Sequence, residues 1–75
     1  MRIEKTYIYN GLKGKDYYIS SANRFSTTYP PILYAETLVW EYDSIKNATI
    51  HIIDEDEAEY QSKDGHDRMI NKYRG

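Results

Sequence analysis

The sequence predicts an α+β domain in which a small antiparallel sheet, of about four strands, is covered by one C-terminal helix. Up to residue 53, short segments rich in β-branched and aromatic residues alternate with turn residues. Residues 62–73 instead place apolar side chains at helical spacing. Since the 75 residues contain no linker, we expect residues 1–75 to form one domain with the helix across one sheet face.

Residues 1–20 are expected to form an amino-terminal hairpin. The segment 2–9 is rich in β-branched and aromatic residues, and Asn10-Gly11 is a strong turn dipeptide. Residues 16–20 then supply a second short strand, in which tyrosines alternate between the two faces.

Residues 21–35 are expected to form a loop that ends at two prolines. Pro30 and Pro31 enforce extended geometry and lack amide donors for a strand ladder. Residues 32–36 are compatible with either the start of a helix or a strand. From residue 36 the strand-favouring composition predicts a central hairpin over 36–53.

Residues 54–61 are expected to form an acidic loop, because adjacent carboxylates repel one another. The closing helix over 62–73 has Ser62 as a candidate cap. Its apolar face consists of His66, Met69, Ile70 and Tyr73. Because glycine is disfavoured inside a helix, Gly65 indicates a close approach, which we expect to be to the strand over 36–42.

Composition indicates a thin core. A domain of this length buries only about 60% of the surface of its unfolded chain, and there is no cysteine to form disulfides. Nine tyrosines provide large side chains that suit both cores and interfaces. We therefore expect a homo-oligomer, since association completes a thin core.

Charge and hydropathy exclude several classes of protein. No apolar run approaches the roughly 20 residues that span a membrane, and no signal peptide is recognisable, so we expect a cytoplasmic protein without membrane contact. The net charge is −2, and the acidic excess lies in the second half of the chain. Generic DNA binding is not expected, because it needs clustered Lys and Arg.

Short motifs follow one another between residues 30 and 73. They are Pro30-Pro31, Glu36-Thr37-Leu38-Val39-Trp40, an acidic hairpin, Tyr60 and Gly65-His66-Asp67-Arg68-Met69. This order resembles a group of small, largely uncharacterised tailed-phage accessory proteins, with Pro-Pro, a Phe-Glu-Thr-Met-Val-Phe-type strand, Arg-Tyr and a final Gly-His-x-x-Met or Gly-His-x-x-Val helix. The chain departs from that pattern at Ala35, at Glu59 and in its longer amino-terminal hairpin.

The resemblance implies a phage origin, a sheet-plus-helix fold and action in the host cytoplasm. Some phage proteins of similar size antagonise bacterial immunity by sequestering a nucleotide signal or by blocking a defence protein. Because a fold does not fix a function, this role is an expectation about the class of protein only.

Candidate chemistry is sparse. His51 and His66 are the only histidines and show no metal-ligand spacing, so we expect no metal and no cofactor. Ser62 and His66 do not form a recognisable nucleophile motif, so we expect no catalytic residues. His66 is interpreted as a packed histidine bonded to a backbone carbonyl, with a ligand contact as the alternative.

Nucleotide recognition requires donors for phosphate and flat surfaces for bases. The 21–35 loop offers both, with supplements from the sheet and the helix, and the alternative is a surface loop packed on the sheet. The candidate ligand-binding residues are Arg24, Phe25, Thr28, Tyr29, Trp40, His66 and Arg68.

A protein-binding role is the alternative. Asp54, Glu55, Asp56 and Glu57 can imitate a phosphate backbone, or they can form an ordinary solvated turn. The leading hypothesis is a non-catalytic anti-defence protein that sequesters a cyclic or ADP-ribose-type nucleotide. The runner-up is an inhibitor that docks on a host defence protein through the acidic loop or a tyrosine-rich surface, and the third is a structural or regulatory phage protein.

Overall fold

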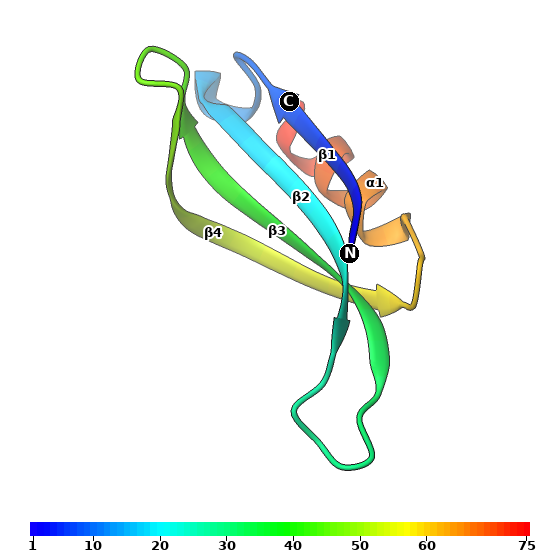
Figure 1. Ribbon diagram of the computed structural model, residues 1–75. Coiled ribbons are helices and arrows are strands. Elements are labelled where there is room, and N and C mark those ends of the chain that lie inside the picture. Colours follow the sequence, from blue (N-terminus) through cyan, green and yellow to red (C-terminus); the bar gives the residue numbers. More distant parts are fainter.

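One four-stranded antiparallel sheet and one helix make up the fold in the computed structural model, which describes all residues from 1 to 75 (Figure 1). The elements are β1 (Arg2–Ile8), a 3₁₀ turn η1 (Leu12–Gly14), β2 (Asp16–Phe25), β3 (Leu33–Asp43), β4 (Ala48–Glu59) and α1 (Asp64–Tyr73). The helix lies against one face of the sheet, as Figure 1 shows. The predicted α+β fold is therefore confirmed.

The strands are arranged in the order in which they occur in the chain, β1-β2-β3-β4. Each is antiparallel to its neighbour, so every connection is a hairpin. Such a sheet has two edge strands, β1 and β4, and two faces of different composition.

The β2–β3 hairpin is longer than the sequence indicated. Pairing runs without interruption from Asp16 with Tyr42 to Phe25 with Leu33. The expected loop over 21–35 is therefore reduced to residues 26–32, where the prolines lie, and residues 33–36 belong to a strand. The prediction failed at the loop ends because hydrogen bonds between two paired strands outweigh the weak strand propensity of polar residues such as Asn23.

The acidic segment is also a strand, and the expected loop over 54–61 is wrong up to residue 59. β4 continues to Glu59 and pairs with β3 as far as Tyr34. Successive side chains on a strand point to opposite faces, which separates the neighbouring carboxylates. Asp54 and Asp56 face the helix, where they meet cations, and this attraction offsets the repulsion on which the loop prediction relied.

Two β-bulges shift the register of β4. Val39 pairs with Asp54 but Trp40 pairs with Ile52, so Ile53 has no partner across the ladder. The extra residue places Asp54 on the helix side together with Val39 and leaves Ile52 on the opposite face together with Trp40.

The helix begins at Asp64, two residues later than the sequence indicated. Ser62 is not its N-cap residue, although its Oγ accepts a hydrogen bond from the Asp64 amide at 3.2 Å. The inward direction of His66, Met69 and Tyr73 is confirmed, since all three are buried. The central hydrophobic cluster joins helix and sheet and consists of Ile8, Tyr17, Ile19, Val39, Met69 and Tyr73.

The single helix of this protein is neither long enough nor apolar enough to cross a lipid bilayer.

Candidate functional site

A buried polar network joins the helix to the sheet at His66. The Nδ1 atom of His66 lies 2.8 Å from the Ser21 Oγ, and its Nε2 lies 2.9 Å from the Thr6 Oγ1. The Ser21 Oγ in turn lies 2.5 Å from the Thr37 Oγ1. His66 and Ser21 are fully buried, and burial lowers the pKa of the imidazole.

Both ring nitrogens of His66 are hydrogen-bonded to side-chain hydroxyls. The backbone carbonyl that the sequence predicted as its partner is therefore wrong. Hydroxyl groups on β1 and β2 take that role because alternation directs Thr6 and Ser21 to the helix side. Ser21 and His66 have the spacing of a nucleophile and its base, yet neither side chain is accessible to a substrate in this structure. The geometry therefore fits a structural role for His66.

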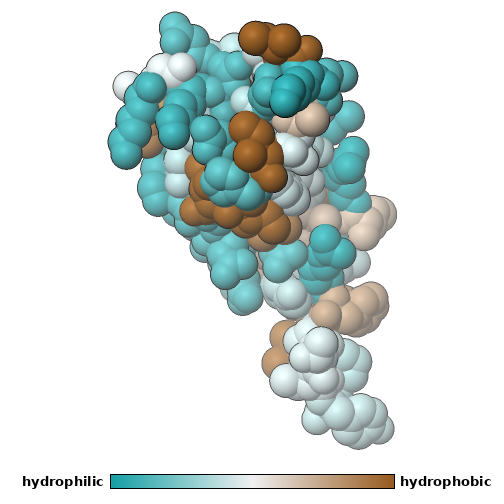
Figure 2. All heavy atoms as spheres, turned by 90° about the vertical axis from the view of Figure 1, so that its left-hand side faces the viewer, coloured by the Kyte–Doolittle hydropathy of each residue, from teal (hydrophilic) through white to brown (hydrophobic).

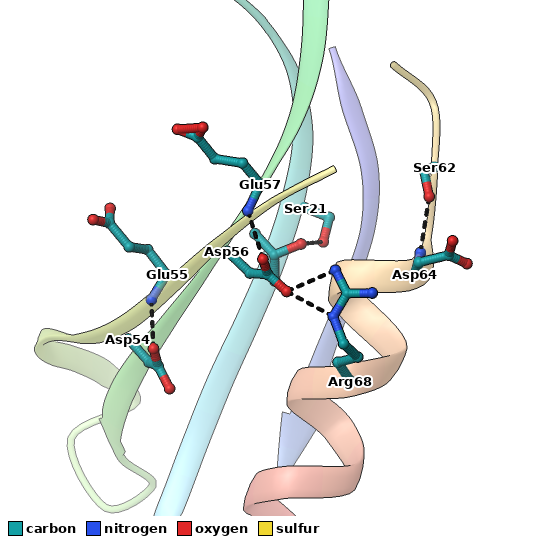
Figure 3. Close-up of polar contacts among 9 residues, drawn as sticks. Ser21, Asp54, Glu55, Asp56, Glu57, Ser62, Asp64 and Arg68 are labelled. Carbon is teal, nitrogen blue, oxygen red and sulfur yellow. Dashed lines mark hydrogen bonds and ion pairs between the residues drawn. The ribbon is translucent and has the colours of Figure 1, made fainter. Parts of the chain in front are cut away.

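Two carboxylates of β4 fix the outer side of the helix. The Arg68 guanidinium donates to the Asp56 Oδ2 through Nε at 2.9 Å, and its second nitrogen lies at 2.8 Å (Figure 3). The Asp54 Oδ2 accepts from the Lys72 Nζ at 2.6 Å and from the Tyr73 hydroxyl at 2.7 Å. The hydrogen bond from Lys72, followed by that from Tyr73, lowers the pKa of Asp54.

The other two of the four carboxylates predicted to bind a protein, Glu55 and Glu57, remain free. Figure 3 shows Glu55 and Glu57 pointing away from Arg68 and the helix. Both are exposed, and neither forms an ion pair within the chain. A surface that imitates phosphate would have only these two members of the predicted four.

The structure does not bring the predicted ligand-binding residues together. Arg24, Phe25, Thr28 and Tyr29 lie in and beside the β2–β3 hairpin tip. Trp40 lies on the sheet face opposite the helix, whereas His66 and Arg68 belong to the helix side. Two of the cations are already paired, since Arg24 lies 3.3 Å from Glu36 and Arg68 binds Asp56.

A surface pocket of about 350 Å³ lies at the base of the hairpin tip. Its lining residues are Phe25, Ser26, Thr27, Ile32, Tyr34 and Glu57. The only charged side chain among them is a carboxylate, so this pocket is not suited to a phosphate.

A larger pocket of about 470 Å³ lies where the sheet extends past the end of the helix. It is called the helix-end pocket here and is lined by Leu12, Lys13, Lys15, Tyr17, Glu41, His51, Ile53, Lys72 and Tyr73. Its size falls within the range of about 300–1,000 Å³ that is usual for small-molecule sites. Three of the ten Lys and Arg residues of the chain are gathered there.

The cations of the helix-end pocket differ in how firmly they are held. Lys13 forms no ion pair, and Lys15 lies 3.4 Å from Glu41. The Nε2 of His51 lies 3.6 Å from the other oxygen of Glu41. Lys72, by contrast, is bonded to Asp54. A ligand anion can therefore recruit Lys13 and Lys15 at little cost in existing contacts.

The sheet face opposite the helix carries a continuous aromatic cluster. Ring centroids lie 4.9 Å apart for Tyr7 and Tyr18, 5.4 Å for Tyr18 and Trp40, and 5.0 Å for Tyr7 and Tyr42. The aromatic face, as it is called below, consists of Tyr7, Tyr9, Tyr18, Leu38, Trp40, Tyr42 and Ile52. Figure 2 views the molecule from the β4 side and shows strongly hydrophobic side chains gathered near its middle, whereas tyrosine and tryptophan lie near the pale centre of its colour scale.

No three His, Asp or Glu side chains come close enough together to hold a metal ion. The sequence did not predict the helix-end pocket, because its residues come from η1, the residue that follows η1, three strands and α1. The only local signal was the pair Lys13 and Lys15 on either side of a turn glycine.

Comparisons with protein-family models, with curated proteins and with solved structures gave no match for this chain.

Proposed function

We propose that this protein is a non-catalytic phage accessory protein that antagonises bacterial defence by binding a nucleotide-type signal stoichiometrically. The observation that carries the proposal is the gathering of Lys13, Lys15 and Lys72 around one pocket in a chain of net charge −2. The phage origin and the anti-defence role rest on the sequence resemblance alone.

The helix-end pocket offers the two kinds of contact that a nucleotide needs. Lys13 and Lys15 supply cations for a phosphate, and the exposed His51 supplies a further nitrogen. Leu12 and Ile53 supply apolar surface for a base or a ribose. The rings of Tyr17 and Tyr73 pack against one another at an angle of 52°, with their centroids 4.7 Å apart, and form part of the wall.

The non-catalytic part of the proposal is supported by the surroundings of the pocket. Its titratable side chains are three lysines, two tyrosines, one histidine and one glutamate, and no serine, threonine or cysteine lines it. The pocket therefore lacks the hydroxyl and thiol nucleophiles that a neighbouring general base activates in Ser-His, Cys-His and related pairs.

Calorimetric titration with ADP-ribose and with a cyclic dinucleotide tests this proposal. We expect micromolar binding of one nucleotide per chain and recovery of the intact nucleotide after the protein is denatured by heat. Lys13→Ala and Lys15→Ala should each weaken binding about tenfold. Lys46→Ala, in the β3–β4 turn, is the matched control and should leave the affinity unchanged.

Absence of binding at micromolar concentration would refute sequestration of these nucleotides. Binding that Lys13→Ala leaves unchanged would place the ligand elsewhere. A cleaved nucleotide after incubation would overturn the non-catalytic assignment.

A protein-binding inhibitor is the second candidate, favoured by the exposed and unpaired Glu55 and Glu57. Such an inhibitor should copurify with one host protein in a salt-sensitive manner. A Glu55→Lys/Glu57→Lys double variant that still captures the same protein would eliminate these carboxylates as the contact.

A further inference from the structure

The face of the sheet opposite the helix has the composition of an interface. In a sheet with one covered face, the other face normally carries polar side chains. Here one row across all four strands reads Tyr7, Tyr18, Trp40 and Ile52. Tyr7 is 42% exposed and Ile52 is 52% exposed, so apolar surface lies open at both ends of the row.

Charges of opposite sign lie at the two edges of this face. The neighbouring row reads Lys5, Ser20, Leu38 and Glu55, with the cation on one edge strand and the carboxylate on the other. Neither Lys5 nor Glu55 forms an ion pair within the chain. The face is thus apolar at its centre, with an unpaired charge of each sign at its two edges.

We propose that two copies of this chain pack through their aromatic faces to form a homodimer with a two-layer sheet. Rotation by 180° about an axis parallel to the strands exchanges β1 with β4 and β2 with β3 while keeping each row in place. Lys5 of each copy then faces Glu55 of the other, and Tyr18 faces Trp40. A two-fold interface requires this kind of self-complementarity.

The area of the face is just sufficient for a specific dimer. Four strands about 4.8 Å apart, paired over roughly eight residues at about 3.3 Å each, cover about 500 Å² per copy, or about 1,000 Å² in total. A biological interface needs about 1,000 Å² of buried surface, so the face just reaches this minimum, and its dense aromatic centre makes the largest contribution. The sheets would lie about 10 Å apart, a distance that Lys5 and Glu55 can bridge.

A second copy fits this face better than a single-stranded nucleic acid does. Aromatic sheet faces can stack bases, but phosphate binding needs an excess of cations. Glu36, Glu55 and Glu57 all lie on this face, and Arg24 is already paired with Glu36. Their charge repels a phosphate backbone, whereas a second copy presents Lys5 to Glu55.

Sedimentation equilibrium with charge-reversal variants tests the dimer. The unmodified chain should sediment with twice the mass of one chain at micromolar concentration. Lys5→Glu and Glu55→Lys each place like charges opposite one another and should raise the dimer dissociation constant by at least about tenfold. The double variant Lys5→Glu/Glu55→Lys restores opposite charges and should return it to near the original value.

Lys63→Glu is the matched control, because it makes the same change of charge on the helix side, next to Glu4. It should leave the dimer intact. Trp40 is the only tryptophan and gives a second readout, since its fluorescence emission should shift to the red as dilution separates the copies.

A monomer at all concentrations would overturn the proposal. A dimer that both single reversals leave unchanged, or that the double variant does not restore, would overturn this two-fold arrangement. These outcomes do not depend on nucleotide binding, because the helix-end pocket lies on the other side of the sheet.

Discussion

Gly65 of α1 lies directly against Thr37 of β3, and a β-carbon built on Gly65 would be 3.0 Å from the Thr37 Oγ1. The hydroxyl of Thr37 cannot move away freely, because it is hydrogen-bonded to Ser21 at 2.5 Å. The close approach that Gly65 indicated in the sequence is therefore the contact between the first turn of α1 and β3.

Gly65→Ala is expected to destabilise the protein by about 1 kcal/mol. Overpacking costs about 1–3 kcal/mol, which exceeds the gain in helix propensity of at most about 1 kcal/mol. Urea denaturation of Gly65→Ala in the native and Thr37→Ala backgrounds checks this explanation. The cost should be smaller without the Thr37 hydroxyl, and a stabilising Gly65→Ala would show that the contact is loose.

Stability should decrease on mild acidification because of His66. Burial holds its pKa below the ordinary value of 6.5, so the unfolded chain takes up a proton at a higher pH than the native protein does. The contribution of neutral His66 is complete above about pH 6.5 and is lost progressively below it, with a slope of at most about 1.4 kcal/mol per pH unit.

Denaturation curves between about pH 7.5 and pH 5 measure this slope. A His51→Gln variant leaves His66 as the only histidine, so one imidazole signal in an NMR titration reports its pKa. A value at or above 6.5 would contradict burial as the dominant influence.

Asp54 should contribute more to stability than its neighbour Glu55. Asp54→Asn removes the charge that accepts from Lys72 and Tyr73, and we expect a loss of about 1.5–3 kcal/mol, typical of hydrogen bonds to a charged group. Glu55→Gln makes the same kind of change on the other face and should alter the monomer's unfolding free energy by less than about 0.5 kcal/mol.

The pKa of Asp54 is lowered in the native state, so its contribution is present above pH 3.8 and is lost as the pH falls through the native pKa. Asp54→Asn should therefore flatten the acid limb of the stability curve. An unchanged acid limb would show that Asp54 is not protonated during acid unfolding.

Truncation of a core side chain should unfold a large fraction of the protein molecules. Ile19 is fully buried at the centre of the sheet, and Ile19→Ala should cost about 2–5 kcal/mol. Only 12 of the 75 residues are buried, so little stability is held in reserve. Ile45→Ala, at a turn residue that is 95% exposed, is the control, and thermal unfolding followed by circular dichroism compares the two.

Periodicity was sufficient to predict the helix and its inward residues, because His66, Met69 and Tyr73 follow one helical face. It was not sufficient for strand ends. The strand character of Asp54 and Asp56 depends on Arg68, Lys72 and Tyr73, which approach them only in three dimensions. Pattern alone treats those carboxylates as neighbours along the chain, where they repel.

The predicted ligand-binding residues do not form one site, for a related reason. Trp40 and Thr37 lie on opposite faces of one strand, but the sequence did not say which face the helix covers. Gly65 against Thr37 decides this and separates Trp40 from His66. The helix-end pocket could not be predicted, because Lys13 and Lys72 are brought together only by the folded chain.

The covered face of the sheet is polar beneath the first turns of the helix, which has a consequence for biosynthesis. A ribosome completes all four strands before it makes α1, so the sheet can assemble while that face is still bare. Beneath the first turns of the future helix lie hydroxyls and carboxylates, those of Ser21, Thr37 and Asp56, which water can solvate in the meantime. A nascent chain therefore exposes little apolar surface at this position. When the helix docks, the His66 imidazole and the Arg68 guanidinium replace the water that solvated these groups.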